Sequence, residues 1–289
     1  MSSEFEKIRR MTLVALAADN ELYHELYLKG GNALALVYGS TDRASLDLDF
    51  SLENDFDDPD SKRLQIAKAL SKEFSSVGYR VFDVTMKQKP SDSRKGPIEG
   101  WGGYDVAFKL IEEDKALKIG DDIGAMQRQA IPVNPNKSPK MEIEISRCEY
   151  TQLTTVATLD DVEIQVYRPE AIIYEKLRAI CQQMPRYPHR ADKSQVPRAR
   201  DFYDIHSTLK EHSDLNLLTP ENLKHAKGIF EAKNVDPALL LDIEEFYEFH
   251  VLDWDSVTQT VRSGSLQDFR VYFDTVKELA IDLHAHWNV

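Results

Sequence analysis

Cysteine is nearly absent from this chain of 289 residues, which contains only Cys148 and Cys181. Two thiols form neither the disulfide framework of a small secreted domain nor a metal-binding knuckle. The sequence also lacks an apolar run close to the roughly 20 residues that a membrane-spanning helix needs. Its N-terminal stretch has no basic start and no continuous apolar segment of the kind found in signal peptides. We therefore expect a cytoplasmic protein without membrane contact.

An excess of positive charge is lacking as well, since the formal net charge is −13. Proteins that cover many phosphates usually carry a basic surface, so any contact with nucleic acid must use a local patch. The most basic stretch lies between Met184 and Arg200 and includes a proline-rich loop at 185–197. Its basic residues are Arg186, His189, Arg190, Lys193, Arg198 and Arg200, against one acid, Asp192. This stretch either contacts RNA or nucleotide phosphate, or it is a solvated loop.

The spacing of apolar residues changes near Pro169. Before it, alternating patterns predict short strands at 25–29, 46–50, 79–87, 104–112, 141–145 and 162–167, with helices at 5–18, 32–38 and 60–76. After it, nearly every segment has helical spacing, and Pro169 suits the first position of a helix. We predict an α/β (α+β, mixed-sheet) core over residues 1–168 and a helical domain over residues 169–289.

Gly30-Gly31 lies between a predicted strand and a predicted helix for which Asn32 is a suitable N-cap. Glycines there let the backbone approach a ligand, and a helix N-terminus favours phosphate. The next predicted strand presents Asp47 and Asp49 on one face, where paired carboxylates suit Mg²⁺. Alone, two glycines indicate a turn and the aspartates a solvated strand face. Their order together predicts metal-assisted phosphoryl or nucleotidyl transfer.

A third carboxylate usually completes a two-metal site. The alternating stretch at 141–145 presents Glu142 and Glu144 on one face, opposite its apolar residues. The sequence leaves open which of the two fills this place, and also whether this face is simply solvated.

Four ordered motifs resemble those of the AbiEii-type toxin nucleotidyltransferases, within the DNA polymerase β-like superfamily. They are K-G-G-N-A-L with R-A-S-L-D-L-D-F at 29–34 and 43–50, K-M-E-I at 140–143, E-K-L-R-A at 175–179 and R-D-F-Y-D-I at 200–205. The chain departs from the family pattern at Asn32, where threonine or serine is usual. The resemblance implies a nucleotidyltransferase core followed by a helical part that completes the active-site cleft.

The resemblance also implies roles for individual residues. Asp47 and Asp49 hold Mg²⁺, or Mn²⁺ in its place, together with Glu142 or Glu144. Lys176 reaches the nucleotide phosphates. Asp201 and Asp204 act as ligand, base or orienting partner of Lys176. The remaining residues implied to contact the NTP are Gly30, Gly31, Asn32, Arg43 and Ser45, with Arg43 either binding phosphate or holding its loop to a carboxylate.

By this resemblance, the chain transfers a nucleoside monophosphate from an NTP to an acceptor such as a tRNA end. It acts as the toxin of a bacterial toxin–antitoxin or phage-defence pair, with an antitoxin protein as partner. Three alternatives remain: a nucleotidyltransferase that modifies small molecules such as antibiotics, a metal-dependent glycosyltransferase, and a non-catalytic nucleotide-binding relative. The short segment before Asp47 disfavours the glycosyltransferase.

Overall fold

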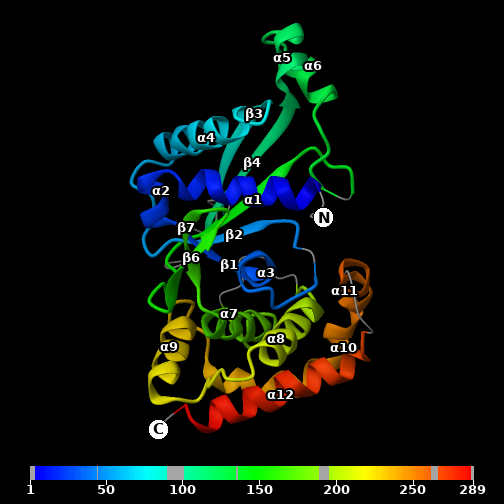
Figure 1. Cartoon of the computed structure of the whole chain (residues 1–289). Coiled ribbons are helices and arrows are strands. Elements are labelled where there is room, and N and C mark those ends of the chain that lie inside the picture. Colours follow the sequence, from blue (N-terminus) through cyan, green and yellow to red (C-terminus); the bar gives the residue numbers. More distant parts are fainter. Residues whose placement is uncertain are drawn as a thin grey trace.

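The computed structural model describes residues 4–43, 45–89, 101–134, 136–188, 195–261 and 266–287. Its centre is a seven-stranded mixed sheet with the order β3-β4-β5-β2-β1-β7-β6 (Figure 1). The pairs β1–β7 and β2–β5 are parallel, and the other neighbours are antiparallel. The strands are β1 (Tyr27–Lys29), β2 (Leu48–Ser51), β3 (Tyr79–Lys89), β4 (Gly103–Glu112), β5 (Met141–Ser146), β6 (Thr154–Leu159) and β7 (Val162–Tyr167).

Helices pack around this sheet, and all the elements described after residue 168 are helical. The α-helices are α1 (Glu4–Ala17), α2 (Asn20–Glu25), α3 (Gly30–Asn32), α4 (Pro59–Ser75), α5 (Glu113–Ile119), α6 (Ile123–Arg128), α7 (Pro169–Cys181), α8 (Ala199–Glu211), α9 (Pro220–Glu231), α10 (Tyr247–His250), α11 (Trp254–Thr260) and α12 (Phe269–Ala285). A π-helical turn, η1 (Ala33–Val37), continues α3, and 3₁₀ segments η3 (Pro237–Phe246) and η4 (Val251–Asp253) flank α10. No helix among the described residues is long and apolar enough to cross a bilayer.

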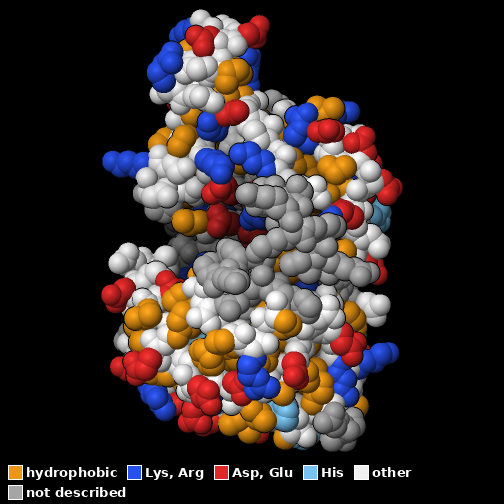
Figure 2. All heavy atoms as spheres, turned by 180° about the vertical axis from the view of Figure 1, so that it is seen from behind, with side chains coloured by type: hydrophobic (Ala, Val, Ile, Leu, Met, Phe, Trp, Pro, Cys, Tyr) orange, Lys and Arg blue, Asp and Glu red, His pale blue; other side chains and the backbone are white. Residues whose placement is uncertain are grey.

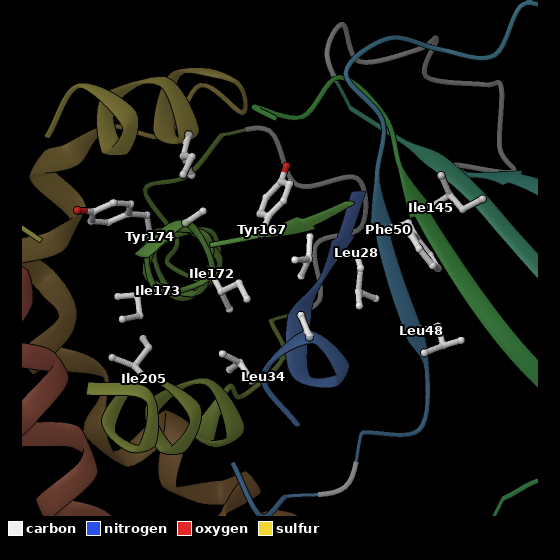
Figure 3. Close-up of a cluster of buried hydrophobic side chains, with 14 of the residues drawn as sticks. Leu28, Leu34, Leu48, Phe50, Ile145, Tyr167, Ile172, Ile173, Tyr174 and Ile205 are labelled. Carbon is white, nitrogen blue, oxygen red and sulfur yellow. The ribbon is translucent and has the colours of Figure 1, made fainter. Parts of the chain in front are cut away.

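Apolar and polar residues alternate along the central strands, so the apolar side chains lie on the face of the sheet that is buried in the core. Leu28, Phe50 and Ile145 lie directly opposite one another on β1, β2 and β5, and all three are buried. Their side chains belong to the cluster that also receives Ile172 of α7 and Ile205 of α8 (Figure 3). The polar residues between them therefore point to the opposite face.

The packing of the helices leaves that polar face accessible near α7. Helices α1 and α4 pack on each other, and they contact β7 and β3 respectively (Figure 1). Helix α7 follows β7 directly and packs against α8 and α9.

One continuous hydrophobic cluster includes residues from both sides of residue 168, and the division into two domains at that point stays a prediction.

The predicted mixed α/β architecture is confirmed, and the predicted elements mostly lie where expected. Strand β6 was not predicted because Thr154–Leu159 is an edge strand that alternates poorly, with buried Leu159 only at its end. The short helices α5 and α6 were also not predicted. The N-cap prediction for Asn32 is wrong: the helix begins at Gly30, so Asn32 lies inside its first turn with helical φ and ψ.

Candidate active site

A cleft of about 420 Å³ opens between the polar face of the sheet and helices α7 and α8. Figure 2 shows a hollow between the strand-rich upper part and the helical lower part, where acidic and basic side chains gather. The predicted site residues that line the cleft are Gly30, Gly31, Arg43, Ser45, Asp47, Asp49, Glu144, Lys176 and Asp201. Among the described residues, the predicted members that do not line it are Asn32, Glu142 and Asp204.

The glycine pair forms the turn from β1 into α3 and leaves room for two charged side chains. Gly30 has a φ of +69°, and a Cβ there would lie 2.4 Å from Oδ2 of Asp49. At Gly31 a Cβ would lie 2.7 Å from Nη2 of Arg43. A side chain at either position would force Asp49 or Arg43 to shift, so the two glycines allow both groups to approach the backbone closely.

Three acidic side chains converge on this turn. Asp49 on β2 lies directly opposite Glu144 on β5, so their side chains share the polar face of the sheet. Asp47 precedes β2 by one residue, outside the strand in which the sequence placed it. Glu142 lies two residues before Glu144 on β5, about 7 Å away by strand rise.

Only one of the two candidate glutamates lines the cleft. Glu142 accepts a hydrogen bond from Lys140 and does not line it. Glu144 lines it, beside Lys89 at 3.7 Å. Which of the two is the third carboxylate stays a prediction, and the position in the cleft favours Glu144.

Crowding of negative charge perturbs the aspartates. Burial, with Glu144 and Asp47, raises the pKa of Asp49 to about 7, although Lys29 acts in the opposite direction. Burial also raises the pKa of Asp47, reinforced by Glu142 and Glu144. A divalent cation would relieve this repulsion.

The donor set fits Mg²⁺ or Mn²⁺ with only part of the coordination sphere supplied by protein. Within the described residues, no group of three or more His, Cys, Asp or Glu side chains has metal-holding geometry. Mg²⁺ commonly takes one or two carboxylates and completes its shell with waters and substrate phosphates. Asp47 and Asp49 match that requirement.

Asn32 binds the backbone of the loop that carries Ser45 and Asp47. It is buried, and its Nδ2 donates to the backbone oxygen of Asp47 at 2.6 Å and to that of Ser45 at 3.5 Å. Its amide nitrogen therefore binds the backbone that carries the carboxylates, and Asn32 does not line the cleft.

Lys176 is held by two acidic residues of α8. Its Nζ donates to Asp201 and to Asp204, both at 2.8 Å. Arg198 and Lys176 keep the pKa of Asp201 well below its usual range, although burial alone would raise it. Of the roles implied for the two aspartates, this geometry supports that of orienting partner.

Arg43 connects the same network to the loop before Asp47. Its Nε and Nη2 donate to the two carboxylate oxygens of Asp204 at 3.0 and 2.7 Å. Arg43 and Lys176 lower the pKa of Asp204, against the opposing effect of burial. Arg43 thus fixes its loop to a carboxylate, the second of its two predicted roles, while it also lines the cleft.

A second charged network, which sequence analysis missed, lines the cleft beside Gly30. Arg178 donates to Glu149 at 2.9 Å and to Glu175 at 3.2 Å. Lys29 lies 3.4 Å from both carboxylates, and Lys233 lies 3.4 Å from Glu149. The five residues come from segments that are distant in the sequence, and only the position of Lys29 before Gly30 could have indicated one of them.

Basic residues also line the cleft at the N-terminus of α8 and at the end of β3. Arg198 and Arg200 belong to the predicted basic stretch, and Lys89 was not predicted. Arg186 instead pairs with Asp242 at 2.5 Å and does not line the cleft. His189, Arg190, Lys193 and Asp192 lie outside the described residues.

Comparisons with known proteins identify the family of this chain. The profile of the family "Nucleotidyl transferase AbiEii toxin, Type IV TA system" matches residues 12–275. No curated protein matches the chain at a significant level. The crystal structure of a "putative nucleotidyltransferase from H. pylori" is similar, with a TM-score of 0.51, 16% identity, and coverage of 99% of this chain and 98% of that one.

A nucleotidyltransferase-like antigenic protein from Paracoccidioides brasiliensis matches at a TM-score of 0.37 and 15% identity, over 88% of this chain and 94% of that one. The H. pylori structure supports the fold, and the family profile extends over most of the chain. The chain therefore belongs to the AbiEii family of type IV toxin–antitoxin systems, and it is a nucleotidyltransferase.

Proposed function

We propose that this chain transfers a nucleoside monophosphate from an NTP to the end of a tRNA in a Mg²⁺-dependent reaction. The observation that carries the proposal is the meeting of Asp47, Asp49 and Glu144 with the Gly30-Gly31 turn in one cleft. Paired carboxylates beside a phosphate-binding turn are the arrangement that metal-assisted nucleotidyl transfer requires.

The chain's own residues would orient the reacting groups. Asp47 and Asp49 would hold Mg²⁺, or Mn²⁺ in its place, and the metal would neutralise charge on the triphosphate. The acceptor hydroxyl oxygen forms a bond to the α-phosphorus, and the bond from the α-phosphorus to the bridging oxygen breaks to release pyrophosphate. Glu144, which lies opposite Asp49, would accept the hydroxyl proton. Lys176, fixed by two carboxylates, offers a point charge to the phosphates.

An RNA acceptor is supported by the basic residues around the cleft. The chain as a whole is acidic, with a net charge of −13, yet Lys89, Arg198 and Arg200 all line this one cleft. Local cations of this kind attract a polyanion in a salt-dependent way. We propose that they contact the phosphates that precede the tRNA end.

Membership of a toxin family supports a biological role. We propose that the activity takes place in the cytoplasm, where NTPs and tRNA are available. There it halts growth, as a defence against phage, unless an antitoxin protein counteracts it. The coarser statement, that of a toxin paired with an antitoxin, follows from the family.

The test is label transfer from each of the four α-labelled NTPs to total bacterial RNA and, separately, to a panel of small acceptors such as aminoglycosides. We expect label in the tRNA fraction with Mg²⁺ or Mn²⁺, and none with EDTA or with Asp47→Ala. The Lys62→Gln variant serves as a control, because Lys62 is a buried lysine outside the cleft.

Label on small acceptors alone would refute the tRNA assignment and favour an antibiotic-type enzyme. Growth arrest by the Asp47→Ala variant equal to that by the native protein would indicate a non-catalytic role. Equal transfer in EDTA would refute the metal requirement.

A further inference from the structure

Lys29 occupies a place in the sheet that brings it to the reacting groups. It lies directly opposite Asp49, which lies directly opposite Glu144, so one row of side chains crosses β1, β2 and β5. Directly opposed residues share a face, with Cβ atoms about 4.5–5.5 Å apart. Lys29 also immediately precedes Gly30, and its side chain lines the cleft while remaining only 12% exposed.

The charge network around Lys29 is balanced without it. Glu149 and Glu175 carry two negative charges, and Arg178 and Lys233 carry two positive ones. Arg178 makes the shortest contact with each carboxylate in this network, at 2.9 and 3.2 Å. Within these five residues, Lys29 therefore adds one positive charge beyond balance, on the side of the network that faces Asp49 and the Gly30-Gly31 turn.

The contacts that Lys29 makes are long for an ammonium group between two carboxylates. Both distances are 3.4 Å, whereas charge-assisted hydrogen bonds are typically about 2.7–2.9 Å. Lys62, also held by two glutamates, makes both of its contacts at 2.7 Å, and Lys176 makes both of its own at 2.8 Å. The geometry around Lys29 leaves its ammonium able to take a better acceptor.

We propose that the Lys29 ammonium binds the β- and γ-phosphates of the NTP beside the Gly30-Gly31 turn, so that the pyrophosphate portion is held between Lys29 and Lys176. This inference rests on the proposed function, since it concerns the same nucleotide. A triphosphate oxygen is a stronger acceptor than a carboxylate that Arg178 already engages. The low exposure of Lys29 strengthens that attraction, because water screens it less.

Equilibrium binding of each NTP and the matching NMP, with Mg²⁺, tests the proposal on the native chain and on the Lys29→Gln, Lys29→Arg and Lys62→Gln variants. We expect Lys29→Gln to lose NTP affinity by roughly 10- to 100-fold, the range for one charged hydrogen bond, and to change NMP affinity by less than about threefold. Lys29→Arg should restore part of the NTP preference. Lys62→Gln should keep both affinities, although it also removes a buried ammonium from a pair of glutamates.

An equal loss of NTP and NMP affinity in folded Lys29→Gln would assign Lys29 a purely structural role and overturn the proposal, as would no loss at all. If Lys29→Gln does not fold, amine acetylation of the native chain replaces it. Mg²⁺-pyrophosphate should then protect Lys29 and not Lys62, and equal labelling would overturn the proposal. Native protein that binds NTP but labels no acceptor would contradict the proposed function and leave this inference standing.

Discussion

Replacing Gly30 by alanine should separate the geometry of the active site from the stability of the fold. The residue has a φ of +69°, a conformation that costs an L-residue about 1–2 kcal/mol. In addition, the new Cβ would lie 2.4 Å from Oδ2 of Asp49, about 1 Å short of the 3.4 Å at which ordinary contact begins. The Asp49 carboxylate must move by about that amount. A misplacement of roughly 1 Å at a catalytic group can lower the rate about 100-fold.

Gly39→Ala is the matched control for the backbone cost. Gly39 has a similar φ of +63°, but nothing lies within 4 Å of its Cβ position, and it does not line the cleft. In urea unfolding, Gly39→Ala should lose about 1–2 kcal/mol, and Gly30→Ala should lose at least as much.

Label transfer from NTP at saturating Mg²⁺ then measures kcat/KM for both variants. We expect Gly30→Ala to lose about 100-fold and Gly39→Ala to stay near the native value. Native-like transfer by Gly30→Ala would refute the reasoning, since it would mean that the position of Asp49 is not critical. An equal loss in Gly39→Ala would attribute the effect to backbone strain alone.

Three further predictions follow from individual contacts. Glu144→Gln should lower kcat by at least 10-fold, whereas Glu142→Gln, outside the cleft, should keep most of it; label transfer by the pair compares them, and the reverse order would exchange their roles. Because burial, Glu144 and Asp47 raise the pKa of Asp49 from 3.8 to about 7, this group favours the fold at low pH, and the fold loses that stability as the pH rises through 7. In EDTA, Asp49→Asn should therefore match the native chain near pH 4 and exceed it by a few kcal/mol at pH 8 in urea unfolding, and a constant difference across this range would contradict the shift. Gly228→Ala would place a Cβ 2.3 Å from the Tyr150 ring, so it should cost about 1–3 kcal/mol in unfolding without a change in kcat, and unchanged stability would show that the ring moves freely.

Local patterns in the sequence were sufficient to predict much of the secondary structure. The alternation at 141–145 predicted β5 because its apolar residues face the core and its glutamates do not. Pro169 marked the start of α7, since proline fits the first turn of a helix. Strand β6 could not be predicted in this way, because its place at the edge of the sheet leaves it without a regular buried face.

The sequence by itself determined the chemical core of the site: two glycines at a strand–helix turn and two aspartates at the start of the next strand. These residues are close in the chain, so strand and turn geometry are sufficient to bring them together. The family motifs extended this set to Lys176 and to Asp201 and Asp204, which the structure joins to Arg43.

Only the tertiary structure decided which glutamate lines the cleft, what Asn32 binds and where Lys29 lies. Each depends on the register between strands or on contacts across the fold, since the register sets Glu144 and Lys29 opposite Asp49. The second charge network has the same origin, because Glu149 after β5, Arg178 on α7 and Lys233 after α9 meet only when these segments have packed together. Periodicity specifies which face a side chain occupies, whereas the partner that it meets on that face is set by packing between distant segments.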